Sequence, residues 1–287
     1  MRRAEPPLDA DLSGLDALEL PIPARKPVAT RLWAVLWPKL AALAFALAAW
    51  QLVVWSGWRP PYVLPGPITV FGRLVTDVGG SDLPTAVAIT LRRAAVGFGL
   101  ALVIGCVVGV AIVQVRALRI AASSFVTGLQ TMPSIAWFPL AILLFGLSEQ
   151  AILFVVILGA APSIANGLIS GVDQIPRILL RAGRMLGARG VASYRHIVLP
   201  AALPSFVGGL KQGWAFAWRS LMAGELLVII ANHPSLGVLL STDQDQADMA
   251  SATAIIIVIL VLGIIVHSLF SLADGAIRRR WGLTGSS

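Results

Sequence analysis

The chain has 287 residues, of which 57% are hydrophobic and 13% are charged, and its formal net charge is +8. A soluble globular domain is about half apolar and one quarter charged, so this composition excludes an ordinary soluble protein. The arginines and lysines lie in short segments between apolar runs and form no basic stripe, which argues against nucleic acid as a partner. We therefore expect one all-α, polytopic membrane domain surrounded by lipid.

Residues 1–37 are polar, rich in proline and partly acidic, unlike the basic-then-apolar layout of a cleaved signal peptide. We interpret them as a cytoplasmic tail, followed by a transmembrane domain over 38–277 and a second tail over 278–287. A helix needs roughly 20 apolar residues to cross about 30 Å of hydrocarbon. The apolar runs predict about six such helices, at 38–56, 86–113, 121–145, 150–171, 203–231 and 252–272.

Basic residues favour one orientation of these helices. The segments 1–37, 114–120, 172–202 and 273–287 hold most of the arginines. The outside segments hold Arg59 and Arg73 together with Asp77, Asp82, Glu149, Asp243, Asp245 and Asp248. The positive-inside rule then places both termini in the cytoplasm. Arg92 and Arg93 fall near the outer end of the second helix and do not fit this rule. We expect their side chains to extend to the lipid headgroups, and a functional role is the alternative.

Two proline-containing segments interrupt the pattern. Four prolines within residues 60–67 exclude a regular helix and predict a stiff loop or interfacial shelf outside the membrane. Pro133 falls inside the third predicted helix, and broken helices at membrane depth belong in protein-buried or cavity-lining places. We predict that this helix faces a translocation pathway through Gln130, Met132 and Pro133. A kinked packing helix is the alternative.

The long polar segment at about 173–200 is expected on the cytoplasmic side. It predicts a short helix after Pro176, a turn at 187–190 and a second amphipathic helix that ends at Pro200. Such an element can dock another protein or lie on anionic lipid. The small residues expected to leave its backbone accessible to a docked protein are Ala182, Gly183, Gly187 and Ala188.

This segment resembles the EAA loop of binding-protein-dependent ABC importer permeases. The family pattern is Glu-Ala-Ala, three residues, Gly, nine residues, Ile, one residue and Leu-Pro. The residues at matching positions are Ala182, Gly187, Ile197, Leu199 and Pro200. The chain departs from the pattern at Arg181, where the family has Glu, and at Gly183, where it has the second Ala. Arg181 puts in doubt any salt bridge that the family's glutamate would make.

Flanking stretches at 129–140, 144–146 and 217–226 are similar to the nitrate, sulfonate, taurine and bicarbonate branch of these permeases. The resemblance implies a type I ABC importer permease fold with a cytoplasmic coupling helix, in a bacterial plasma membrane. It also implies a homodimer with a second permease copy, two ATP-binding cassette subunits and an external solute-binding protein. The implied substrate is a small anionic solute; a vitamin precursor or other organic solute, and a membrane anchor or assembly role, are the alternatives.

Ionisable residues within predicted spans are candidates for function. Arg219 and Glu225 lie six residues apart in the fifth helix, on different faces, so we do not expect them to pair. Arg219 is expected to pair with a carboxylate on another helix or to hold an anionic substrate, and Glu225 is a candidate contact to the partner permease. Trp218 and Asn166 complete the pathway candidates, with an interhelical hydrogen bond the expected role of Asn166.

Nothing in the chain predicts an enzyme. Its lysines, Lys26, Lys39 and Lys211, lie outside any Gly-x-x-x-x-Gly-Lys phosphate loop. We therefore expect no catalytic residue and no bound cofactor, with ATP and Mg²⁺ on a separate ATPase. The three histidines lie in separate segments without metal-ligand spacing, so no metal site is expected within the chain.

Overall fold

The computed structural model describes residues 28–115, 119, 128, 130–230 and 233–280. Parts of the predicted tails, at 1–27 and 281–287, and the start of the third predicted helix, at 120–127, lie outside the described residues. The chain divides into two units, residues 1–58 and 59–287. The described part of the first unit contains one long helix, α2 (Val28–Trp55), which begins well before the predicted residue 38.

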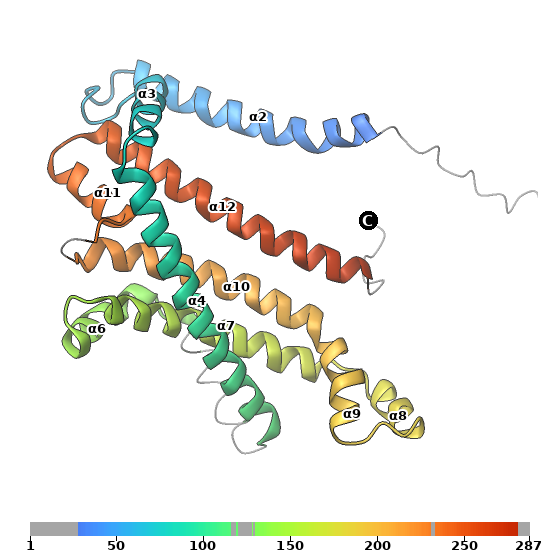
Figure 1. Cartoon of the computed structure of the whole chain (residues 1–287). Helices are drawn as coiled ribbons and strands as arrows, with labels where there is room; N and C mark the ends of the chain where they lie inside the picture. Colours follow the sequence, from blue (N-terminus) through green and yellow to red (C-terminus); the bar gives the residue numbers. More distant parts are fainter. Residues whose placement is uncertain (1–27, 116–118, 120–127, 129, 231–232, 281–287) are drawn as a thin grey trace, which may run out of the picture. The chain divides into compact units, whose positions relative to one another are not determined.

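The second unit is built from helices, and no strand occurs among its described residues (Figure 1). The longest helix on its N-terminal side, α4, is followed by the central helix α7 and then by α10 and α12. The elements in chain order are α3 (Pro67–Val78), α4 (Asp82–Gln114), η2 (Ser134–Trp137), α6 (Phe138–Phe145), α7 (Glu149–Asp173), α8 (Arg177–Met185), α9 (Val191–Ser193), η3 (Tyr194–Val198), α10 (Leu199–Leu227), α11 (Leu236–Asp245) and α12 (Met249–Arg280).

The core lies where α7 packs between α4 and α10. Small residues allow this close approach: a Cβ added to Gly167 on α7 would lie 2.6 Å from the Cα of Gly209 on α10. On the other side of α7, a Cβ added to Gly105 of α4 would lie 2.8 Å from the carbonyl oxygen of Ala161 of α7. Two pairs of glycines spaced four residues apart, Gly105 and Gly109 on α4 and Gly167 and Gly171 on α7, therefore serve close packing within the chain.

Four described helices are long and apolar enough to cross a membrane: Leu36–Trp55, Asp82–Gln114, Glu149–Asp173 and Met249–Arg279. The other two of the about six predicted helices, the third and the fifth, differ from these four. The third is broken at Met132 and Pro133, after which come a 3-10 turn and the eight-residue α6. The fifth, α10, has 29 residues but is less apolar, because it carries Lys211, Arg219 and Glu225.

Two short helices between the spans were not predicted. Residues 60–66 are irregular, as their prolines require, but Pro67 then starts the amphipathic helix α3. A proline is compatible with this position because the first amides of a helix have no partner within it. The second short helix, α11, has its first turn capped by Ser235, which accepts a hydrogen bond from the amide of Val238.

Candidate translocation and coupling site

The segment that follows α7 forms a helical hairpin. Helix α8 is followed by a turn in which Gly187 has a φ of +85° and Gly190 a φ of +54°. Both values lie in the left-handed region that glycine adopts without a steric penalty. The amide of Ala188 donates to the carbonyl of Gly183 over 2.9 Å and closes the turn onto α8. The predicted turn at 187–190 is thus present.

The predicted end of the second helix at Pro200 is wrong. The helical run that starts at Val191 passes through η3 and continues as α10, with Pro200 in the first turn of α10. Residues 194–198 form one π-helical turn, in which the amide of Leu199 donates to the carbonyl of Tyr194. Such a wider turn accommodates the missing proline amide without ending the helix. One helical run therefore connects the hairpin to the far end of α10.

Gly183 is buried, which corrects the expectation that its backbone is accessible to another protein. A Cβ at this position would lie 1.9 Å from Cδ1 of Ile197, so the isoleucine fills the space that an alanine would need. The departure from the family's second alanine has a physical reason within this chain. The exposed surface of the hairpin combines apolar and basic side chains. Met185, Leu186 and Val191 are 87%, 88% and 82% exposed, and the arginines at 181, 184, 189 and 195 are exposed as well.

At the opposite end of α10, a buried cluster of charged and polar groups surrounds Glu225. The Glu225 side chain is 0% exposed and accepts a hydrogen bond from Arg93 Nη1 over 3.2 Å. Thr90 Oγ1 donates to the same carboxylate over 2.9 Å, and the backbone amide of Gly237 donates over 3.2 Å. Thr90 in turn accepts from the amide of Leu236. The cluster joins α4, α10 and the start of α11.

Arg93 also contacts Glu149, the first residue of α7, through Nη2 at 3.3 Å. Arg92 contacts the same carboxylate at 3.3 Å but is mostly exposed. The expectation that both arginines extend to the headgroups is therefore wrong for Arg93, whose side chain is only 3% exposed. The expected contact of Glu225 with a partner chain is replaced by contacts within the chain. Arg93 and Glu225 have opposite charges and fall near the outer ends of the second and fifth predicted helices. This placement could have indicated that the two residues pair.

The predicted pathway residues fall into two groups beside α10. Gln130 donates a hydrogen bond to Ser163 on α7 over 3.2 Å and, with Met132, lines a small cavity beside Phe216. Trp218 and Arg219 line a cavity of about 570 Å³ between α10 and α12. Pro133 ends the helix that carries Gln130, and Asn166, half-buried on α7, lines neither cavity.

Arg219 is exposed although it lies within α10. Its Nε donates to the carbonyl of Ala215 over 3.0 Å, and its guanidinium lies 4.9 Å from the centre of the Phe216 ring. Among the residues that the structure describes, no carboxylate pairs with Arg219. The expected ion pair of Arg219 with a carboxylate on another helix is thus not observed within the described part of the chain. Arg219 and Glu225 do not pair with each other, as predicted from their spacing.

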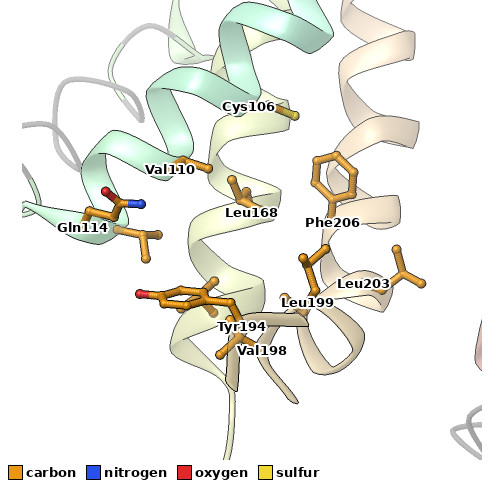
Figure 2. Close-up of a pocket in the computed structure, with 12 residues that line it drawn as sticks. Cys106, Val110, Gln114, Leu168, Tyr194, Val198, Leu199, Leu203 and Phe206 are labelled. Atoms are coloured by element: carbon orange, nitrogen blue, oxygen red, sulfur yellow. The ribbon is translucent and has the colours of Figure 1, made fainter. Parts of the chain in front are cut away.

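A third cavity of about 370 Å³ lies where the hairpin meets the spans (Figure 2). Tyr194, Val198 and Leu199 lie at one end of it, and Cys106 of α4 lies at the other. Leu168 and Phe206 contribute from α7 and α10. Its lining is almost entirely apolar, so the hairpin is attached to the spans by loose apolar packing at this point and not by a polar network.

The comparison with known families agrees with this arrangement of spans, hairpin and α10. Residues 101–279 match the family described as the binding-protein-dependent transport system inner membrane component. The chain belongs to this family. It is therefore the membrane-spanning permease subunit of an ABC importer, and ATP is hydrolysed by a separate subunit. The family also implies partnership with ATPase and binding-protein subunits.

Several permeases are similar to this one over most of its length. A probable ABC transporter permease of Brucella melitensis is 29% identical over 82% of this chain and 93% of its own. The taurine transport system permease of Escherichia coli is 28% identical over 78% of this chain and 85% of its own. A nitrate import permease of Synechocystis is 29% identical over 65% of this chain and 70% of its own.

Solved structures of importers show the same fold. The MetNI methionine ABC transporter in an inward facing conformation matches with a TM-score of 0.54 and 25% identity, over 69% of this chain and 95% of that chain. An amino acid ABC transporter matches with a TM-score of 0.53 at 15% identity, over 68% and 92% of the two chains. The permease fold expected from the loop pattern is thereby confirmed.

Proposed function

We propose that two identical copies of this permease form a pathway for a small anionic solute, and that each hairpin at 173–200 docks one ATP-binding cassette subunit. Both termini lie in the cytoplasm of a bacterium, and an external binding protein delivers the solute. ATP and Mg²⁺ bind to the cassette subunits. Relatives named for taurine, nitrate and aliphatic sulfonates support an anionic substrate.

The observation that carries the substrate proposal is the exposed guanidinium of Arg219. A charge within a span is costly in lipid and belongs in a bundle interior or a water-filled cavity. Arg219 lines the cavity between α10 and α12 and has no carboxylate partner among the described residues. In a dimer whose pathway is lined by the face of α10 that carries Arg219, the guanidinium would attract an anion. The hydrogen bond from Arg219 to the carbonyl of Ala215 would hold the guanidinium in place.

Uptake into proteoliposomes tests the role of Arg219. The wild-type complex, with its ATPase and binding protein, would be offered taurine, nitrate and butanesulfonate. We expect uptake of at least one of these anions, a loss of that uptake in Arg219→Gln and partial retention in Arg219→Lys, which keeps the charge. Unchanged uptake in Arg219→Gln would remove Arg219 from the pathway. Failure of the wild type to take up any of the three would argue against an anionic substrate.

The hairpin supports the docking proposal through its exposed apolar tip. Met185, Leu186 and Val191 are too exposed to stabilise this chain alone, and three large apolar side chains exposed around one turn fit a protein partner. The helical run from Val191 through α10 ends beside the cluster around Glu225. A movement imposed on the hairpin by ATP binding would therefore pass along α10 as a rigid body to α11.

A substitution at the tip separates docking from lipid contact. We expect Leu186→Asp to abolish binding of the ATPase subunit to the reconstituted permease, because it places a carboxylate in an apolar interface. Leu186→Met is the matched control, since it keeps an apolar side chain of similar volume. Binding is measured by co-purification and coupling by ATPase activity. If Leu186→Asp binds and couples like the wild type, the hairpin is not the docking element.

One observation favours a second candidate substrate, an organic solute with a flat ring. The rings of Trp214 and Trp218 stack with centroids 5.9 Å apart and line the same cavity as Arg219. Aromatic side chains bind flat apolar groups through stacking. Benzenesulfonate, offered against nitrate in the same uptake assay, tests this candidate. A preference for benzenesulfonate that is lost in Trp218→Ala supports it, and equal uptake of both anions by the wild type contradicts it.

A further inference from the structure

We propose that α3 is an interfacial helix whose exposed apolar stripe lies on the surface of the phospholipid bilayer. The stripe consists of Ile68, Phe71, Val75 and Val78, which recur at helical spacing on one face. Ile68 is 86% and Val75 is 75% exposed, so the protein itself covers little of this face. The proposed partner is the bilayer, at the level where α4 and α12 begin.

The side of α3 that faces the rest of the protein attaches the helix to it. Val70 is fully buried, and Leu74 packs against the cluster that contains Leu83 and Leu236. Arg73 Nη2 contacts Asp248 at 2.9 Å, and Arg73 Nε donates to Ser251 over 2.7 Å. These contacts fix the rotation of α3 about its axis. The stripe is therefore presented in one direction and cannot turn inward to be buried.

The place of α3 in the chain sets its depth in the membrane. Asp248 directly precedes the first residue of α12, and α4 begins at Asp82, shortly after α3 ends at Val78. Both neighbours are helices long and apolar enough to span a membrane, so α3 lies at the level where two spans begin. The 12 residues of α3 extend about 18 Å, which is too short to cross about 30 Å of hydrocarbon.

The direction of α3 agrees with a position along the surface. Figure 1 shows that α3 does not run parallel to α12, so the axis of α3 is inclined to the membrane normal when α12 spans the membrane. Thr69 and Thr76 lie on the face away from the stripe and are exposed. A polar face towards water and an apolar face about 5–10 Å into the headgroup boundary is the arrangement of interfacial amphipathic helices.

Other partners fit the observations less well. A second copy of the chain or the external binding protein could cover an apolar stripe, but neither explains why the stripe lies at the level where two spans begin. A phospholipid surface is present at that level whatever the oligomeric state. The inference therefore does not depend on the proposed substrate or on the docking of the ATPase.

Site-directed fluorescence distinguishes these partners. The only cysteine, Cys106, would be replaced by alanine, and an NBD fluorophore attached in turn to Val75→Cys and Thr76→Cys in full-length permease in lipid nanodiscs. Thr76 is the matched control, because it is adjacent in sequence but lies on the polar face. We expect blue-shifted emission and quenching by lipids with a shallow doxyl group at position 75, and water-like emission quenched by iodide at position 76.

Three results would overturn the inference. Iodide quenching at position 75 equal to that at position 76 would show that the stripe faces water. Protection of position 75 from iodide without quenching by doxyl lipid would indicate that a second copy of the permease covers the stripe. Protection from iodide that needs added binding protein would indicate that the binding protein covers it. Ile68→Cys provides a second labelled position on the stripe. Should the Val75 variant fail to fold, position 68 decides between the same outcomes.

Discussion

The guanidinium of Arg93 lies 3.2 Å from the carboxylate of Glu225, and both side chains are buried. The two residues lie 132 positions apart in the chain. Their contact fixes the end of α10 against α4, and the amide of Gly237 adds the start of α11 to the same carboxylate. Glu225 is therefore the point at which the helix that begins in the hairpin is connected to the opposite end of the permease.

Removal of Glu225 is expected to destabilise the fold. Glu225→Ala leaves Arg93 as a buried charge without its main partner, which costs about 3–5 kcal/mol. Thermal unfolding of the purified permease measures the change. Glu149→Ala is the control, because Glu149 contacts the same arginine but is partly exposed, and it should cost about 1 kcal/mol or less. Equal losses in the two variants would contradict the central role of Glu225.

Replacement of both partners provides a further comparison. The double variant Arg93→Met/Glu225→Met removes the buried charges together and fills their space with apolar side chains. We expect it to be more stable than Glu225→Ala, since apolar replacement of a buried ion pair is often neutral or stabilising. A double variant as unstable as the single one would show that the other hydrogen bonds of Glu225, from Thr90 and Gly237, carry most of the stability.

Adjacent glycines on α10 should respond in opposite ways to alanine. A Cβ on Gly209 would lie 2.6 Å from the Cα of Gly167, whereas a Cβ on Gly208 would meet nothing within 4 Å. Gly209→Ala must separate two backbones and is expected to cost about 1–3 kcal/mol or more. Gly208→Ala should be neutral or stabilising by up to about 1 kcal/mol, because alanine favours helix. Similar melting temperatures for the two variants would contradict the close packing of α7 on α10.

The contact between Gly183 and Ile197 should be sensitive to volume. Gly183→Ala forces Cδ1 of Ile197 to move, since the added Cβ would lie 1.9 Å from it. The isoleucine can change rotamer, so we expect a cost of about 1 kcal/mol and a measurable decrease in ATPase coupling. Gly183→Ala/Ile197→Val removes the clashing methyl group and should restore coupling. If the double variant remains as impaired as the single one, the loss has another cause.

Two aspartates near the start of α12 have pKa values shifted in opposite directions. Burial raises the pKa of Asp243 above its ordinary value of 3.8, and the charges of Asp248 and Asp77 act in the same direction. A hydrogen bond from the backbone amide of Ser251 lowers the pKa of Asp248 below the same value, despite partial burial, with help from the Ser251 hydroxyl and Arg73. The ionised form of Asp248 therefore stabilises the fold, and that of Asp243 destabilises it.

The sign of each pKa shift determines how the stability of the fold changes with pH. A lowered pKa gives stability that is present above pH about 4 and is lost as the pH falls through the folded-state value. A raised pKa gives a penalty that is present at neutral pH and is relieved on acidification. At pH 7 we expect Asp248→Asn to lower the melting temperature and Asp243→Asn to raise it, with both differences decreasing towards pH 3. Differences that do not change with pH would exclude a charge effect.

Much of this permease follows from its sequence. Lipid requires long apolar helices whose backbone groups are satisfied internally, so composition and run length predict the membrane domain and most of its spans. Pro133 predicts the break in the third helix, and the glycines at 187–190 predict the turn of the hairpin, because both act through their own backbone. These local features also carried the resemblance that the family match confirms.

The tertiary structure decided the features that depend on which helices meet. Arg93 is buried because Glu225 and Glu149 come from two other helices, and no periodicity within α4 indicates that pairing. Gly183 is inaccessible because Ile197 folds back onto it, and the helix passes through Pro200 because a π turn precedes it. Sequence patterns determine the state of each segment, whereas burial and pairing of a side chain depend on neighbours that only packing brings together.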